Sequence, residues 1–272
     1  GVEVTVKIGI FYRTDYVVPA KEVYEKLKSH FDILFFKDSS ENFPEVVDDK
    51  TFEPQVVISV GGDGTVLRVL KKVKCPVIGV KAGRLGFFSG YLLSEIDKLI
   101  EDLKNWNFIE DKRWILRVES QVGVFFAIND AVLQKDVSQK IVDFTVEMTD
   151  GTFYYHADGL VVSTPTGSSA YALALGGPII LPNVEAFEIT PMAPQFLATR
   201  SLVIPSTEKI KITVNDMVSL VVDGDVVGKV KEVYVRKCSK VITLLRPKSY
   251  DFSTSIKEKI GYGKMLLKNG SE

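Results

Sequence analysis

In the first part of the chain, segments with the apolar pattern of a strand alternate with segments that have the apolar spacing of a helix. Short apolar runs or alternations predict strands at residues 4–10, 33–36, 56–60 and 77–80. Helical spacing predicts helices at residues 20–30, 66–72 and 94–104, the last of them capped by Ser94. Strands that alternate with helices predict a mainly parallel sheet covered on both faces, in which ligands bind beyond the carboxyl ends of the strands.

Around Trp114 the pattern changes. Residues 142–148 alternate apolar and polar side chains and lead through a turn at 149–151 into a further strand. Residues 210–214 and 233–235 alternate in the same way, on either side of a hairpin at 221–225. This region is therefore predicted to be mainly antiparallel, in the form of a β-sandwich.

These patterns predict an α/β protein of two domains. An α/β domain is expected over residues 1–112, and a mainly antiparallel β domain over residues 113–249. Residues 250–272 include a predicted helix at 253–264, and we expect them to pack back on the first domain.

Composition narrows the class of protein. Hydrophobic residues make up 46% of the 272 residues, which is enough for a packed core. The net charge is −1, from 34 basic and 35 acidic residues, and this argues against a nucleic-acid binder that works through its overall field. Cys75 and Cys238 lack the spacing of a metal site. No apolar stretch reaches the ~18 residues of a membrane span and no signal peptide is evident, so a cytoplasmic protein with no membrane partner is expected.

The most informative motif is the glycine loop Gly61-Gly62-Asp63-Gly64-Thr65, which follows the strand at 56–60 directly. Such a loop before a helix can hold phosphate, because glycine allows close approach and the helix start presents free N–H groups. Asp63 would repel an anion unless it takes a proton or holds a metal; the alternative is that it only braces the turn. The loop matches neither a P-loop nor a dinucleotide-binding fingerprint.

A second polar cluster runs from Asp158 to Tyr171 and is dense in hydroxyl groups. Five hydroxyls around one helix start exceed what capping needs, so the surplus predicts a pocket for a neutral polar ligand such as a ribose or a carboxamide. A surface turn rich in Pro, Gly and Ser is an equally good interpretation. The helix that follows is expected to end at Gly176-Gly177.

A third candidate is the pair Asn129-Asp130, inside an otherwise apolar strand at 125–133. Buried polar groups need partners, and an Asn side chain suits the edge of a purine base. A strand-end turn is the alternative. Arg84, in another loop after a strand, and His156, two residues before Asp158, are weaker candidates for ligand contact.

Together these motifs resemble those of the NAD kinase family. Its members carry Gly-Gly-Asp-Gly-Thr, Gly-Arg-Leu-Gly-Phe, Asn-Glu, Asp-Gly, and Thr-Pro-Thr-Gly-Ser with Ala-Tyr. Here the corresponding residues stand in the same order at 61–65, 83–87, 129–130, 158–159 and 164–171. Asp130 stands where many members have Glu, so the carboxylate is kept on a shorter side chain.

The resemblance implies that ATP or another donor phosphorylates the 2′-hydroxyl of the adenosine ribose of NAD, giving NADP. It implies Asp63 as proton acceptor and a phosphate cradle of Gly61, Gly62, Gly64 and Thr65. It also implies a homodimer or homotetramer that can share sites. Because glycine N–H groups alone neutralise the charge of the transferred phosphoryl group poorly, Mg²⁺ or another divalent cation is expected on the donor phosphates, with no metal site from the protein alone. The NAD-binding residues that the resemblance implies are Asp63, Gly64, Phe87, Asn129, Asp130, Asp158, Thr166, Ser169, Ala170, Tyr171 and Ala193.

Two rival functions are weighed against this one. Lipid kinases related to diacylglycerol kinase share Gly-Gly-Asp-Gly-Thr, but an apolar substrate groove would leave the hydroxyls of residues 164–169 unexplained. A nucleotide-sensing module without catalysis is the other rival, and the intact Asp63 argues against it.

Overall fold

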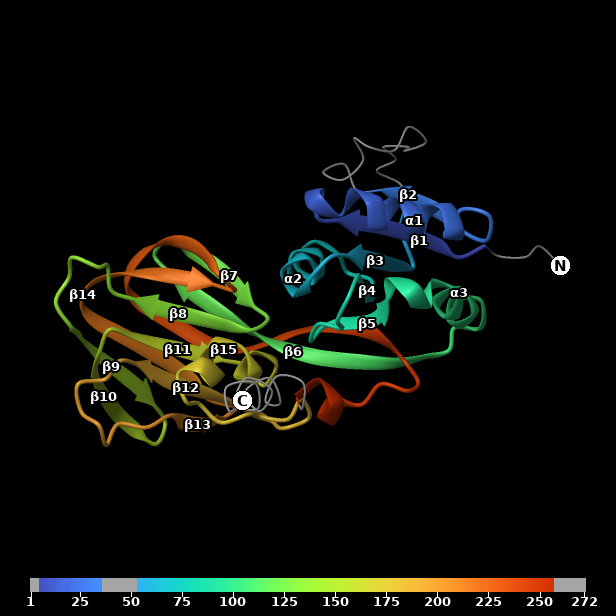
Figure 1. Ribbon diagram of the computed structural model, residues 1–272. Coiled ribbons are helices and arrows are strands. Elements are labelled where there is room, and N and C mark those ends of the chain that lie inside the picture. The colour runs from blue at the N-terminus through green and yellow to red at the C-terminus, as the bar shows by residue number, and fades with distance from the viewer. Residues whose placement is uncertain (1–4, 36–52, 257–272) are drawn as a thin grey trace, which may run out of the picture. The chain divides into compact units, whose positions relative to one another are not determined.

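A computed structural model describes residues 5–35 and 53–256 (Figure 1). The chain forms two compact units, one from residues 1–112 with 242–272 and the other from residues 113–241. Each unit is described by itself. None of the helices within the described residues is long and apolar enough to cross a bilayer.

The sheet of the first unit is parallel. Its strands are β1 (Lys7–Tyr12), β2 (Asp32–Phe35), β3 (Val56–Val60), β4 (Val77–Lys81) and β5 (Ser89–Leu92), hydrogen-bonded in the order β2-β1-β3-β4-β5. β3 is fully buried, as expected for a strand covered on both faces. The parallel sheet predicted from the alternating spacings is confirmed.

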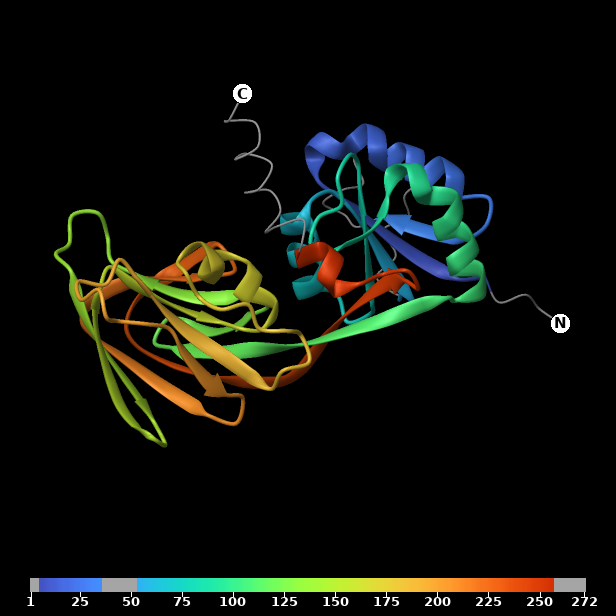
Figure 2. The same cartoon turned by 60° about the horizontal axis from the view of Figure 1, so that its bottom comes forward.

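Helices cover both faces of this sheet. Apolar residues of α1 (Val17–Leu27) and α3 (Ile96–Asn105) share one core cluster with alternate residues of β1, β3 and β4. On the other face, Val66 of α2 (Asp63–Lys72) packs against Gly79 of β4, where a Cβ would come within 3.3 Å of it. Figure 2 shows α1 and α3 together on one side of the strands.

The starts of all three helices differ from the sequence prediction. α1 begins at Val17 rather than at residue 20. α2 begins at Asp63, inside the glycine motif, rather than at residue 66. The predicted cap at Ser94 is wrong, because Ser94 lies within a 3₁₀ turn, Leu93–Glu95, that precedes α3. There the carboxylate of Glu95 accepts the N–H of Leu92 at 2.9 Å, so this side chain satisfies the amide just before the turn.

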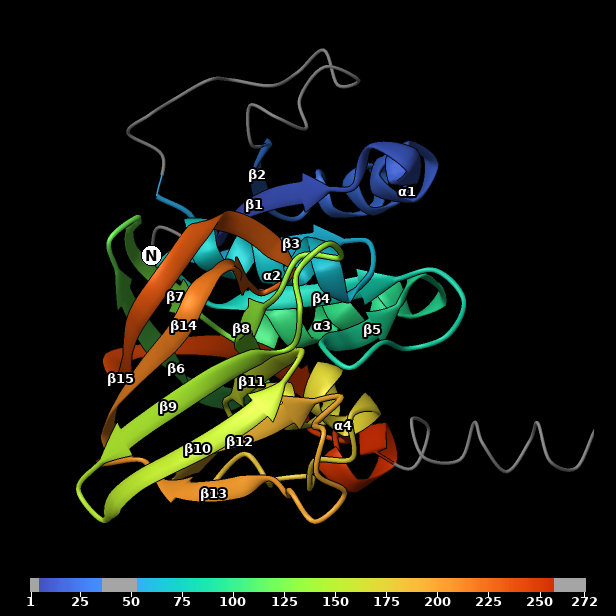
Figure 3. The same ribbon diagram turned by 90° about the vertical axis from the view of Figure 1, so that its left-hand side faces the viewer.

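The second unit is antiparallel throughout. The strands that build it are β6 (Phe108–Ser120), β7 (Gly123–Ala127), β8 (Asp130–Gln134), β9 (Val142–Met148), β10 (Gly151–Ala157), β11 (Gly159–Ser163), β12 (Ala186–Met192), β13 (Leu202–Pro205), β14 (Lys209–Val222) and β15 (Asp225–Pro247). β9 and β10 form the hairpin predicted from the alternation around residue 149 (Figure 3).

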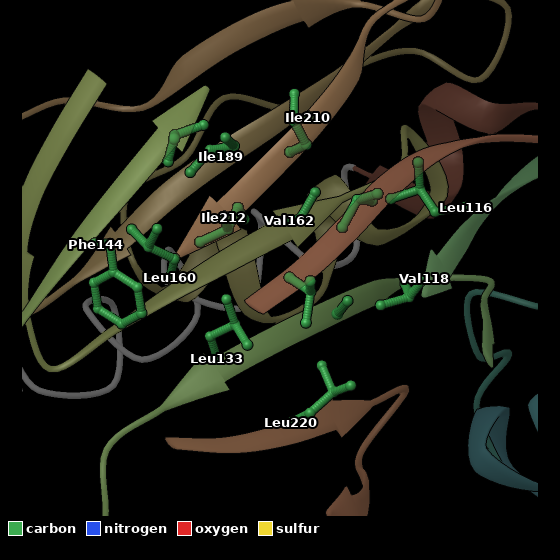
Figure 4. Close-up of a cluster of buried hydrophobic side chains, with 14 of the residues drawn as sticks. Leu116, Val118, Leu133, Phe144, Leu160, Val162, Ile189, Ile210, Ile212 and Leu220 are labelled. Atoms are coloured by element: carbon green, nitrogen blue, oxygen red, sulfur yellow. The ribbon is translucent and has the colours of Figure 1, made fainter. Parts of the chain in front are cut away.

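β14 joins the two sheets of the sandwich. Its first half pairs with β9, its second half pairs with β8, and the register shifts between Thr213 and Val218. Such an irregularity lets one strand bend from one sheet into another. Inward side chains from both sheets, among them Leu133, Phe144 and Ile212, form a single apolar core (Figure 4).

The chain passes between the units at residues 112/113 and 241/242. The sequence pattern placed the second passage at residue 250. β15 continues unbroken to Pro247, and its Leu244 pairs with Val77 of β4, so the end of this strand belongs to the first unit. Residues 252–256 are helical, as predicted, and the rest of the predicted helix lies outside the described residues.

One carboxyl group lies in the interior of the second unit without a partner. Glu188 of β12 is fully buried, and neither carboxyl oxygen has a hydrogen-bond partner among the described residues. It faces Ser163 of β11, whose hydroxyl is also unpartnered, and a Cβ on Gly177 would lie 3.2 Å from Glu188 Oε1. Burial raises the pKa of Glu188 from 4.5 to about 8.

This pKa predicts that stability falls as pH rises from about 5 to 8. In that window the folded chain keeps a proton on Glu188 that the unfolded chain releases. We expect Glu188→Gln to lose less free energy of unfolding between these pH values than the native chain does, measured by urea denaturation. Glu22→Gln, which removes an exposed carboxylate of α1, controls for the loss of one charge. Equal pH dependence in the native chain and Glu188→Gln would contradict the prediction.

Candidate functional site

The glycine motif lies at the carboxyl end of β3, where it starts α2. Gly61 has a φ of 155°, and a Cβ there would lie 2.7 Å from the Thr65 hydroxyl, so the chain can turn only at a glycine. A Cβ on Gly62 or Gly64 would meet no atom within 4 Å. The space beside these two glycines is therefore open, and the first amides of a helix start lie beside it.

Asp63 is the first residue of α2, and its carboxylate binds the loop after β4. Its Oδ2 accepts the N–H of Phe87 and its Oδ1 accepts the N–H of Phe88, each at 3.0 Å. A Cβ on Gly86 would lie 2.5 Å from Oδ1, so this close approach requires glycine. The contact joins the glycine motif at residues 61–65 to the Gly-Arg-Leu-Gly-Phe motif at residues 83–87. Asp63 therefore does more than brace its own turn, which was the alternative interpretation.

Two further residues of that loop were candidates. Phe87 is buried, and its ring packs edge-on against the rings of Phe88 and Phe252. Arg84 is exposed. A pocket role for Phe87 stays a prediction.

In the second unit, Asn129 and Asp130 lie at a break between strands. The single strand predicted over 125–133 is wrong, because β7 ends at Ala127 and β8 begins at Asp130. The backbone amides of this break donate hydrogen bonds to Asp223, which lies in the turn between β14 and β15. Its carboxylate accepts the N–H groups of Ile128, Asn129 and Asp130 at 2.8, 2.7 and 3.1 Å.

The hydroxyl-rich segment after β11 is bound to the same break. Thr164 donates its amide to the Asn129 carbonyl at 3.0 Å and its hydroxyl to the Ile128 carbonyl at 2.6 Å. A Cβ on Gly167 would lie only 2.0 Å from the Asn129 oxygen. Residues 164 and 167 therefore hold this segment against the polar pair.

Most of the hydroxyls in this segment have protein partners. The Thr166 hydroxyl accepts a hydrogen bond from the buried Arg113 at 3.1 Å. Ser168 donates to the Pro165 carbonyl, and Ser169 donates to the Thr166 carbonyl. The surplus that suggested a ligand is thus largely used to build the turn, which is followed by the short helix α4 (Tyr171–Ala174).

A pocket of about 360 Å³ lies beside this construction. Four of the predicted NAD-binding residues line it, namely Asn129, Asp130, Ala170 and Tyr171. The rest of its lining is Val132, Gln134, Val221, Asp223 and Gly224. The structure thus brings the polar pair and the start of α4 together around one cavity.

Other predicted residues of this unit are not among the residues that line the pocket. Thr166 and Ser169 are buried in the turn. Asp158 lies 3.9 Å from the Lys135 ammonium, and His156 is hydrogen-bonded to Asp143. Ala193 is exposed with a φ of 47°.

Sequence reasoning missed Asp223 as a member of this site. Residues 223–224 were interpreted only as a hairpin turn, and both have the positive φ of such a turn. Their partners lie more than 90 positions earlier in the chain. Nothing in the local pattern distinguishes this Asp-Gly from an ordinary turn.

No group of three or more His, Cys, Asp or Glu side chains in the described part of the chain could hold a metal ion. A cation that is bound mainly by the phosphates of a nucleotide and by water fits this observation, because Mg²⁺ needs only one or two protein carboxylates. Asp63 is the carboxylate within the glycine motif.

Comparisons with known proteins bear on both units. Residues 12–108 match the ATP-NAD kinase N-terminal domain, and residues 128–246 match the ATP-NAD kinase C-terminal domain. An NAD kinase of Thermotoga petrophila is 43% identical over 263 residues, covering 96% of this chain and 99% of the relative. An NAD kinase of Thermosipho melanesiensis is 47% identical over 243 residues, covering 85% of this chain and 95% of the relative.

Two solved structures share the fold. Yeast NADH kinase complexed with NADH has a TM-score of 0.81 at 23% identity, over 96% of this chain and 89% of that one. An NAD kinase from Archaeoglobus fulgidus in complex with ATP has a TM-score of 0.73 at 22% identity, over 94% and 98%. Because both family domains match in order and the bacterial relatives are similar over most of the chain, this protein belongs to the NAD kinase family.

Proposed function

We propose that this chain transfers a phosphoryl group from ATP to the 2′-hydroxyl of the adenosine ribose of NAD, forming NADP, and that Asp63 accepts the hydroxyl proton. The observation that carries the role of Asp63 is its placement. The carboxylate lies at the start of α2, and two loop amides orient it at 3.0 Å each. The lipid-kinase and sensing alternatives are not favoured, because both domains match NAD kinases.

The glycine motif would handle the phosphates. The start of α2 presents backbone N–H groups and the positive end of the helix dipole, both of which favour an anion. The space beside Gly62 and Gly64 admits a phosphate without a steric clash. Each carboxylate oxygen of Asp63 receives one amide hydrogen, and a carboxylate oxygen can accept more than one, so capacity for a proton remains.

The pocket beside Asn129 would hold the adenosine end of NAD. Its lining combines two side-chain amides and two carboxylates with apolar side chains such as Val132 and Val221. This is the combination of apolar wall and few placed polar groups that small-molecule sites show. Asp223 would set the pocket's shape, because it binds the three amides that orient Asn129 and Asp130.

We also propose a cytoplasmic homodimer or homotetramer, as the family resemblance implies. Phe196 and Leu197, between β12 and β13, are 63% and 91% exposed, and self-association would cover such apolar side chains. Light scattering of the purified protein measures the mass, and a monomer at micromolar concentration would exclude the assembly.

Replacement of Asp63 by Asn tests the proton acceptor. General-base catalysis contributes about 10²–10⁴-fold, so we expect kcat to fall by that order while the KM for NAD changes little. The Asn amide also places a donor against one of the two loop amides, so the melting temperature is measured in parallel. Asp97→Asn, which changes an exposed carboxylate on α3, is the control. Near-normal kcat in a folded variant would remove Asp63 from the mechanism.

Replacement of Asp223 by Asn tests the NAD pocket. Asn tolerates the positive φ of this position, but whichever way its amide turns, its nitrogen faces a backbone N–H group. A mismatch of this kind costs about 1–3 kcal/mol. We expect the Kd for NAD, measured by titration calorimetry, to rise about tenfold. Asp225→Asn, which changes an exposed carboxylate in the same hairpin, should leave it unchanged. Unaltered NAD affinity in Asp223→Asn would separate Asp223 from ligand binding.

Removal of divalent cations tests the donor complex. The described residues contain no cluster that could hold a metal alone, and backbone amides alone neutralise a nucleotide triphosphate poorly. We expect NADP formation to stop in excess EDTA and to return when Mg²⁺ is added. A coupled assay with an NADP-specific dehydrogenase, itself active in EDTA, reads the product. Full activity in EDTA would contradict a metal-bound donor.

A further inference from the structure

A buried arginine lies beside the loop that binds Asp63. Arg246 is in β15, one residue before the strand ends, and its side chain is fully buried. A guanidinium taken out of water must be paired and hydrogen-bonded, because otherwise its lost hydration destabilises the fold. The partners of Arg246 therefore indicate which part of the structure this buried charge stabilises.

The partners of Arg246 come from three segments. Nε donates to Asp111 Oδ2 at 3.2 Å, and Nη2 lies 3.2 Å from the same oxygen. Nη1 donates to the carbonyl oxygens of Phe87 and Ser89 at 3.0 and 3.3 Å. The guanidinium carbon lies 4.2 Å from the centre of the Tyr250 ring. Arg246 is thus fixed by a carboxylate and a ring, and it holds the loop by its carbonyls.

One peptide group joins Arg246 to Asp63. The carbonyl oxygen of Phe87 accepts from Arg246, and the amide of the same peptide bond, the N–H of Phe88, donates to Asp63 Oδ1 at 3.0 Å. A trans peptide points its oxygen and its hydrogen in opposite directions, so the cation and the carboxylate hold its two ends. Each charge polarises the peptide toward the other, which strengthens both hydrogen bonds.

We infer that Arg246 is a positioning residue for Asp63: through the 87–88 peptide it fixes the direction of the Asp63 carboxylate. The inference rests on the proposed role of Asp63 in proton transfer. Without the guanidinium the two carbonyls lose their donor, the peptide is free to rotate, and the carboxylate loses one of its two fixed partners. A general base displaced by a fraction of an ångström loses rate while ligand binding persists.

Arg246→Lys is the first test. Lysine keeps the charge but lacks the planar fork that reaches Asp111 and two carbonyls together. We expect kcat for NAD phosphorylation to fall at least about tenfold, with the KM values for NAD and ATP within about twofold of the native ones. Arg236→Lys, which changes an exposed arginine of the same strand, should leave kcat unchanged. A matched loss in both variants would overturn the inference.

A double-mutant cycle with Asp63→Asn separates positioning from a general structural role. If Arg246 acts through Asp63, Arg246→Lys should lower kcat by less than about twofold once Asp63 is Asn. Multiplicative losses in the double variant would overturn the inference and leave the role of Asp63 standing. Native-like kcat in Asp63→Asn alone would instead refute the proposed role of Asp63 in proton transfer, so the two failures are distinguishable.

A second pair of variants covers the case in which Arg246→Lys does not fold. Tyr250→Leu removes the ring beside the guanidinium, whereas Tyr250→Phe keeps the ring and removes only a hydroxyl that has no partner among the described residues. We expect Leu to lower kcat several-fold and Phe to lower it less, with KM preserved in both. Equal kcat in the two folded variants would overturn the inference.

Discussion

Where the chain leaves a strand, its backbone N–H groups no longer have a neighbouring strand to bond and need another acceptor. In each unit a single aspartate carboxylate accepts several of these N–H groups. Asp63 receives two amides of the loop after β4, and Asp223 receives three amides of the break between β7 and β8. Charge-assisted bonds of this kind are stronger than bonds between neutral groups. Both loops can therefore be irregular, which a binding site requires, and still be held in one conformation.

Glycine supplies the space that these carboxylate contacts need. Gly86 lets its loop approach Asp63, and Gly167 lets the hydroxyl-rich turn lie on the Asn129 carbonyl. At both positions a methyl group would overlap an oxygen atom. The glycines of the motifs thus divide into two kinds: some serve contacts inside the protein, while Gly62 and Gly64 face open space that a ligand could enter.

Local sequence pattern predicted the elements whose causes are local. The buried strand before Gly61, the hairpin around residue 149 and the end of α4 shortly before Gly176 follow from spacing and turn chemistry. The break between β7 and β8 did not, because residues 125–133 are apolar throughout except for the pair itself. The break exists because Asp223 and Thr164, both distant in sequence, take its amides and carbonyls. The start of α2 at Asp63 was not predicted for a similar reason. The Asp63 carboxylate has its partners in another loop, 24 residues further along the chain, and the local pattern does not show them.

Because the end of β15 belongs to the first unit, completion of that unit depends on the order in which the chain is synthesised. Residues 242–247 complete the sheet at Leu244 and supply Arg246, yet they follow the whole second unit in sequence. On the ribosome, residues 5–112 therefore emerge with the loop after β4 still lacking its guanidinium and with the end of β15, which pairs with β4 at Val77, still absent. The first unit cannot reach its final arrangement until the sandwich has been synthesised, so a nascent or truncated chain that holds the glycine motif lacks the complete surroundings of its own aspartate.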